Sequence, residues 1–229
     1  MAEPTCMKSD RRPGRETTRG RMVLIASTVA FVLAWLSASH GGSTLHADRW
    51  LVDFAVHHRT VRLTDLARTL TRLGSAVVVV PVTVVACATF AVRRHFRMAI
   101  LIAASTAITA TAVMAVKYLV PRSGPTTPVH LVLAVGRAFP SGHAAQSVAC
   151  YAALAWIFTR TTDSPPKRVA AWATATGLAL GVGWSRIYLA VHWPTDVVAG
   201  WALAASVLAS LSLVEPIVRH QRSRNPSER

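Results

Sequence analysis

An arginine, a histidine and an aspartate between residues 185 and 196 are spaced closely enough to act on one substrate. They are Arg186, His192 and Asp196, and apolar segments flank them on both sides. Pro194 suits the first turn of a helix, because the N–H that it lacks would have no partner there. A helix that begins at this proline would carry Asp196 in its first turn. Its carboxylate could then orient the ring of His192, as in one half of a catalytic triad; a polar loop that caps a helix is the alternative.

A second polar group, Pro140-Ser-Gly-His143, lies directly before another apolar segment. Ser141 suits the N-cap of a helix, and Gly142 allows backbone to approach a ligand closely. Free N–H groups and the positive end of the helix dipole favour a phosphate at such a position. His143 would stand beside that phosphate, although a lone histidine is more often structural.

Two cationic residues follow a further apolar segment, in the stretch Lys117-Tyr-Leu-Val-Pro-Arg122-Ser-Gly-Pro125. A lysine at the end of a membrane helix often lifts its ammonium group to the interface, which is the simpler role for Lys117. The functional alternative is that Lys117 forms one wall of an anion-binding pocket.

The elements that must position these groups are predicted to be membrane helices. Of the 229 residues, 52% are hydrophobic and 15% are charged, which is a low charged share for a soluble domain. We expect an all-α bundle of six transmembrane helices in one domain, residues 22–215, with one amphipathic helix at the membrane surface between the first two spans. The apolar segments cover residues 22–39, 75–92, 98–116, 144–159, 169–184 and 197–214. A signal peptide is the alternative for the first segment.

The net charge of +15 is concentrated between the apolar segments. Basic residues gather in two expected tails, 1–21 and 216–229, and in two connections, 93–97 and 160–168. Six spans would place all four clusters on one side, so the positive-inside rule predicts a multi-pass protein of the cell membrane with cytoplasmic termini. No nucleic-acid partner is expected, because the basic residues do not line one face.

In this order, the three polar groups resemble the motifs of the type 2 phosphatidic acid phosphatase superfamily. That family, which includes lipid phosphate phosphatases, polyprenyl diphosphate phosphatases and vanadium haloperoxidases, carries Lys-x6-Arg-Pro, Pro-Ser-Gly-His and Ser-Arg-x5-His-x3-Asp. The second motif is complete here, and the third is complete with Ser185. The first departs from the pattern, because Gly124 occupies the arginine position. Arg122, two residues earlier, is the replacement candidate, and Arg137 is a weaker one.

The resemblance implies a membrane hydrolase that needs no metal or cofactor and acts on a lipid phosphate such as phosphatidic acid or undecaprenyl diphosphate. It implies a nucleophile (His192), an orienting carboxylate (Asp196), a general acid and base (His143) and a phosphate-binding set (Lys117, Arg122, Ser141, Gly142 and Arg186). An outward-facing site favours a lipid carrier of the cell envelope. Gly124 leaves a second hypothesis open, an impaired relative that binds or transports lipid phosphates. A vanadate-dependent peroxidase is disfavoured, because those relatives are soluble.

Overall fold

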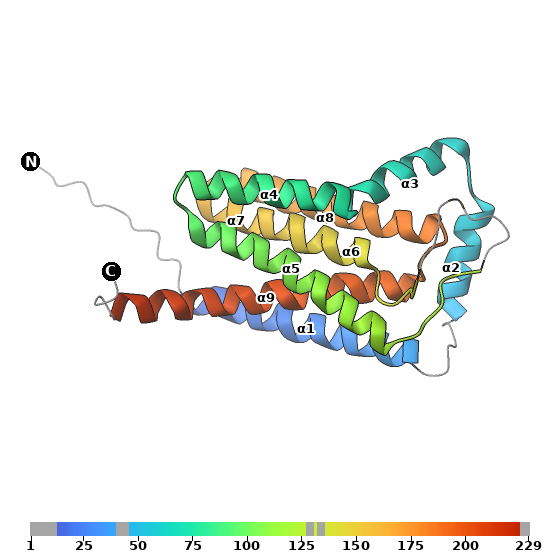
Figure 1. Ribbon diagram of the computed structural model, residues 1–229, viewed down its shortest axis with the longest axis horizontal. Coiled ribbons are helices and arrows are strands. Elements are labelled where there is room, and N and C mark those ends of the chain that lie inside the picture. The colour runs from blue at the N-terminus through green and yellow to red at the C-terminus, as the bar shows by residue number, and fades with distance from the viewer. Residues whose placement is uncertain (1–12, 40–45, 127–130, 132–135, 225–229) are drawn as a thin grey trace, which may run out of the picture.

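The computed structural model describes residues 13–39, 46–126, 131 and 136–224. Within this part of the chain the regular structure is helical and no strand occurs, which confirms the expected all-α class (Figure 1). The helices are α1 (Pro13–Ser39), α2 (His46–His57), α3 (Val61–Leu73), α4 (Ala76–Val92), α5 (Phe96–Leu119), α6 (Gly142–Ser147), the π-helical η1 (Val148–Ala152), α7 (Ala153–Thr161), α8 (Pro165–Tyr188) and α9 (Pro194–Arg224).

Three of the described helices are long and apolar enough to cross a membrane. They contain the spans Thr17–Ser39, Phe96–Leu119 and Pro194–Val214, and a fourth span results if α3 and α4, which bend by 43° at their junction, are taken as one. Apolar side chains also cover outer surfaces of the bundle; Val77 and Val92 on α4 are 83% and 85% exposed. Soluble proteins rarely expose apolar surface on this scale, so the chain is a membrane protein.

The helix boundaries differ from the expectation at both ends of the chain. Helix α1 begins at Pro13 rather than Met22, and α9 continues to Arg224, so parts of both expected tails are helical. A helix can extend past the apolar core of a membrane because its backbone hydrogen bonds are internal to it. The remaining tail residues, 1–12 and 225–229, lie outside the described residues.

The segment between the first two expected spans contains two helices, α2 and α3, instead of one. Helix α3 is amphipathic, as expected for this segment, and packs along α8. The side chain of Leu70 lies 3.3 Å from the position that a Cβ on Gly181 would take, and Ala67 is fully buried. A protein neighbour therefore covers at least part of the face for which the sequence suggested a membrane surface.

Small residues bring the remaining helices into close contact. Helices α6, η1 and α7 run without a break from residue 142 to residue 161. Gly200 on α9 lies against the start of this helix, and a Cβ there would lie 2.5 Å from the backbone oxygen of Ser141. Glycine at this position lets the backbones of α9 and α6 pack directly on each other.

The bundle brings four helix ends together. Helices α1 and α9 pack side by side in opposite directions, since Gly20 faces Leu213 while Ala38 packs with Ala199. The end of α5, the start of α6, the end of α8 and the start of α9 lie at the same end of the bundle, and α2 crosses that end (Figure 1). All three polar motifs belong to these helix ends.

Candidate active site

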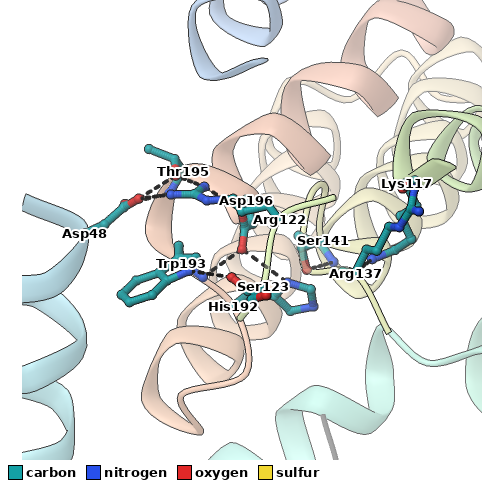
Figure 2. Close-up of polar contacts among 11 residues, drawn as sticks. Asp48, Lys117, Arg122, Ser123, Arg137, Ser141, His192, Trp193, Thr195 and Asp196 are labelled. Atoms are coloured by element: carbon teal, nitrogen blue, oxygen red, sulfur yellow. Dashed lines mark hydrogen bonds and ion pairs between the residues drawn. The ribbon is translucent and has the colours of Figure 1, made fainter. Parts of the chain in front are cut away.

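The start of α9 has the predicted geometry. The helix begins at Pro194, Asp196 lies in its first turn, and His192 comes just before it. Asp196 Oδ2 lies 3.5 Å from His192 Nδ1, with the carboxylate fully buried (Figure 2). This distance is within ion-pair range but too long for a good hydrogen bond, and catalytic hydrogen bonds often tighten only when substrate binds. The Nε2 atom of the ring is left for chemistry.

The carboxylate of Asp196 is held on both sides. Oδ1 accepts a hydrogen bond from Arg122 NH1 at 2.7 Å, and Oδ2 accepts one from the backbone N–H of Trp193 at 2.9 Å. These two bonds fix the rotation of the carboxylate, so that Oδ2 remains on the side of His192.

The second motif is attached directly to the third. The backbone N–H of Ser141 donates to the backbone oxygen of Asp196 at 2.9 Å. The Ser141 hydroxyl accepts from the N–H of Ala144 at 3.5 Å, so the predicted N-cap is confirmed. Residue 143 follows within the first turn, and its backbone oxygen packs against Gly74 in the turn between α3 and α4. His143 is within electrostatic range of Lys117, Arg186 and His192.

Two cations lie beside the histidines. Arg186 donates from NH1 to the hydroxyl of Thr71 at 2.8 Å, and its Nε is buried without a hydrogen-bond partner. The Lys117 ammonium donates to the backbone oxygen of Arg137, and Arg137 donates back to the backbone oxygen of Lys117 at 2.8 Å. Arg137, the weaker replacement candidate, thus binds backbone next to the site, and Lys117 and Arg186 lie within electrostatic range of both histidines.

Arg122 has partners other than the expected phosphate. Its side chain is 2% exposed, NH1 binds Asp196 and Thr195, and NH2 binds Asp48 Oδ2 at 2.8 Å. Two carboxylates therefore neutralise this guanidinium inside the protein. Arg122 is therefore already paired and does not offer the free cationic group that the sequence suggested.

Gly124 is packed against the residue before the nucleophile candidate. A Cβ at this position would lie 3.1 Å from the backbone oxygen of Val191. That separation is tighter than ordinary van der Waals contact, so a larger residue would push on the segment that carries His192. A side chain at position 124 therefore requires the Val191 backbone to shift by a few tenths of an ångström.

The environment of His192 favours its neutral form. Burial lowers the pKa of this histidine, and the nearby charges of Arg186 and Lys117 lower it further, while Asp196 acts in the opposite direction. A neutral ring with one nitrogen facing a carboxylate has its second nitrogen free as a nucleophile.

A cavity of about 460 Å³ lies beside this site, between α2 and residues 121–126. Arg49, Asp53, Gly124 and Trp193 are among its lining residues, whereas His143 and His192 are not. The cavity therefore lies next to Trp193, which directly follows His192, and on the side of α2. Across the described residues, no three side chains of His, Cys, Asp or Glu are grouped so that they could hold a metal ion.

Sequence reasoning missed three polar residues that support the site. Asp48 on α2 binds both Arg122 and Thr195, and Thr71 on α3 binds Arg186. The only signal for Asp48 in the sequence was that acidic residues are rare in this chain, which has 10 of them against 25 basic residues. Nothing in the local sequence of Thr71 or Thr195 indicated a partner so distant along the chain.

Residues 116–218 match the family model of the PAP2 superfamily. The matched segment includes every motif residue, from Lys117 to Asp196. This match confirms the resemblance inferred from the three motifs. No curated protein sequence matches the chain.

Two crystal structures share this PAP2 architecture. The first, described as the first transmembrane PAP2 type phosphatidylglycerolphosphate phosphatase from Bacillus subtilis, is 23% identical, with a TM-score of 0.76 over 85% of this chain and 96% of that one. The second, Aquifex aeolicus LpxE, is 21% identical, with a TM-score of 0.58 over 74% of this chain and 96% of that one. At this identity the likeness establishes the PAP2 membrane fold.

Proposed function

We propose that the chain is an integral membrane phosphatase that hydrolyses a lipid phosphate or polyprenyl diphosphate through a phospho-histidine intermediate. The observation that carries this proposal is the placement of His192, whose Nδ1 faces Asp196 at 3.5 Å while Lys117 and Arg186 lie close by. A nucleophile, an orienting carboxylate and paired cations are the requirements for phosphoryl transfer without a cofactor.

In the first step, Nε2 of His192 attacks the phosphorus and forms the P–N bond as the P–O bond to the leaving group breaks. Asp196 stabilises the positive charge that develops on the ring. His143 donates a proton to the departing oxygen, so the alcohol or phosphate leaves without excess negative charge.

In the second step, His143 accepts a proton from a water molecule that attacks the phosphorus. The P–N bond breaks, inorganic phosphate forms, and His192 returns to its starting state. Lys117, Arg186, the Ser141 hydroxyl and the N–H groups near Gly142 hold the equatorial phosphate oxygens as charge shifts between them. The fixed cations serve where other phosphatases use a metal ion, so we infer that activity is metal-independent.

The position of the site in the bundle supports a lipid substrate. Lys117 lies near the end of the span in α5, and His192 directly precedes the span in α9. A phosphate headgroup reaches this level of a bilayer while its acyl or prenyl chain remains in the hydrocarbon region. Among such substrates, an undecaprenyl diphosphate or a phosphatidic acid fits the proposal.

We further propose six spans, formed by α1, α4, α5, the continuous helix of residues 142–161, α8 and α9. The helix of residues 142–161 and α8 contain many small and polar residues, which are tolerated where helices pack inside a bundle. The basic connections, 93–97 and 160–168, lie at the end of the bundle opposite the site. By the positive-inside rule, that end and both termini are cytoplasmic and the site faces outward, in one domain of residues 22–215.

The direct test is phosphate release by purified protein in detergent micelles, measured over a panel of phosphatidic acid, phosphatidylglycerophosphate and undecaprenyl diphosphate. We expect release from at least one of these lipids, unchanged by addition of a chelator. Chelator-sensitive release would contradict the metal-independent scheme. Binding of lipid phosphates without release would favour the second candidate, a lipid-phosphate binding or transport protein, which Gly124 and the neutralised Arg122 support.

Activity is expected to follow a bell-shaped pH profile whose acid limb lies below pH 6.5, about the ordinary value for histidine. Burial lowers the pKa of His192, so the ring stays neutral and nucleophilic where an exposed histidine is protonated. Activity is lost as the pH falls through this lowered pKa. The measurement is kcat/KM against pH, and an acid limb above pH 6.5 would contradict the structure.

Two aspartate variants test whether the acid limb of the pH profile reports the protonation of His192. Asp196→Asn removes the charge that favours the protonated ring, so the limb of its residual activity should move to lower pH. Asp65→Asn removes an exposed carboxylate on α3 and should leave the limb in place.

Restoring the family arginine by Gly124→Arg is expected to lower activity, because its Cβ would press on the Val191 backbone beside His192. Such crowding typically costs about 1–3 kcal/mol of stability. Phosphate release and thermal unfolding of the variant would measure both effects. Gly177→Ala on α8, where nothing lies within 4 Å of an added Cβ, is the control. Activity above that of the parent protein would show that the site accommodates an arginine here.

A further inference from the structure

A chain of three buried charges runs from α2 to the nucleophile candidate. Asp48 Oδ2 lies 2.8 Å from Arg122 NH2, and Arg122 NH1 lies 2.7 Å from Asp196 Oδ1 (Figure 2). All three side chains are at most 2% exposed. Water therefore does not screen these contacts, and each charge depends on its partners.

Asp48 also holds the first turn of α9. Its Oδ1 accepts from the backbone N–H of Thr195 at 3.0 Å, and its Oδ2 accepts from the Thr195 hydroxyl at 2.6 Å. The same hydroxyl accepts from Arg122 NH1 at 2.6 Å. Asp48 thus fixes both the arginine that binds Asp196 and the residue that directly precedes Asp196.

The charge of Arg122 is shared between two carboxylates. Because Asp48 takes part of the guanidinium's charge, Asp196 retains negative charge for the ring of His192 on its other oxygen. Among the residues that the structure describes, the other charged or titratable groups that act on His192 are Arg186 and Lys117, which oppose its protonation, and the neighbouring His143. The strength of the His192–Asp196 pair is therefore set in part from α2.

We propose that Arg122 and Asp48 are positioning residues that aim Asp196 at His192 and set how strongly it stabilises positive charge on the ring, without contacting the phosphate. The catalytic consequence of this inference rests on the proposed phosphatase activity. The effect of Arg122 and Asp48 on the protonation of His192 is present in the protein without substrate. The role differs from direct phosphate binding, in which loss of Arg122 would weaken the affinity for phosphate.

The proposal predicts shifts of opposite sign for two substitutions. Asp48→Asn leaves Arg122 to neutralise Asp196 alone, so His192 should become protonated only at lower pH. Arg122→Gln frees Asp196, so His192 should become protonated at higher pH. We expect each titration midpoint to move by at least about half a pH unit, since paired charges at this range shift such midpoints by one unit or more. A general loosening of the fold would not separate the two variants by sign.

The experiment is an NMR titration of full-length, histidine-labelled protein in detergent micelles, with the His192 signal assigned by His192→Gln. Arg122→Lys, which keeps the charge, serves if Arg122→Gln does not fold; its midpoint should lie nearer to that of the parent. Asp65→Asn and Arg68→Gln alter an exposed ion pair on α3 and should leave the midpoint unchanged. Equal midpoints in all variants, or shifts of the same sign, would overturn the proposal.

Kinetics on the same variants separates positioning from phosphate binding. We expect kcat to fall by about 10- to 100-fold, as for small displacements of a catalytic group, with KM and inhibition by inorganic phosphate changed less than about twofold. Weaker phosphate inhibition at unchanged kcat would mean that Arg122 binds phosphate directly and would overturn the inference. If the parent protein releases no phosphate from any lipid, the proposed function fails, while the NMR titration still decides the positioning role.

Discussion

Replacing His192 with alanine is expected to lower phosphate release by at least about 10⁴-fold, the scale of losses when a nucleophile or its base is removed. Without the ring there is no atom to form the P–N bond, and the cations alone only bind the phosphate. The measurement is the initial rate of phosphate release from the best lipid of the substrate panel, with protein purified in the same detergent.

The covalent intermediate gives this prediction a second readout. Brief incubation with radiolabelled substrate should leave acid-labile label on the parent protein and none on His192→Ala. His58→Ala is the matched control, because that histidine is exposed and its ring contacts Phe54, through a hydrogen bond to the backbone oxygen and through ring packing. Release by His192→Ala at the parental rate would exclude the proposed mechanism.

Replacing Arg186 with alanine is expected to lower activity by about 10³-fold, and more than Lys117→Ala does. Arg186 can hold two phosphate oxygens at once, whereas a lysine provides a point charge. Arg186 has to stabilise a larger share of the phosphate charge, because Gly124 provides no side chain and Arg122 is neutralised by two carboxylates. Initial rates of the two variants under saturating and limiting substrate would measure the difference.

Further variants at Arg186 and at its hydrogen-bond partner Thr71 test this prediction. Arg186→Lys should recover only part of the activity, because it keeps the charge but loses the planar pair of donors. Thr71→Val should cost less than Arg186→Ala, since it removes one 2.8 Å hydrogen bond that orients the guanidinium. Arg68→Ala on the exposed face of α3 should have no effect. A smaller loss for Arg186→Ala than for Lys117→Ala would contradict the assignment.

Local signals in the amino-acid sequence were sufficient for the helical class and for the ends of the site helices. The start of α9 at Pro194, the cap at Ser141 and the separation of Asp196 from His192 each depend on residues within one helical turn. Propensity, capping and periodicity act over this distance, so they can be read without knowledge of the fold. The three motifs also sufficed to predict the resemblance to the PAP2 superfamily, whose model matches residues 116–218.

The partners of the charged residues depend instead on how the helices pack. Arg122 was expected to be free for a phosphate, but α2 brings Asp48 to one of its nitrogens and α9 brings Asp196 to the other. The contacts of Thr71 with Arg186 and of Gly200 with Ser141 likewise join segments far apart in the chain. Such pairings follow from the packing of whole helices, because an ion pair or a close backbone contact leaves no periodic pattern in the sequence around either member.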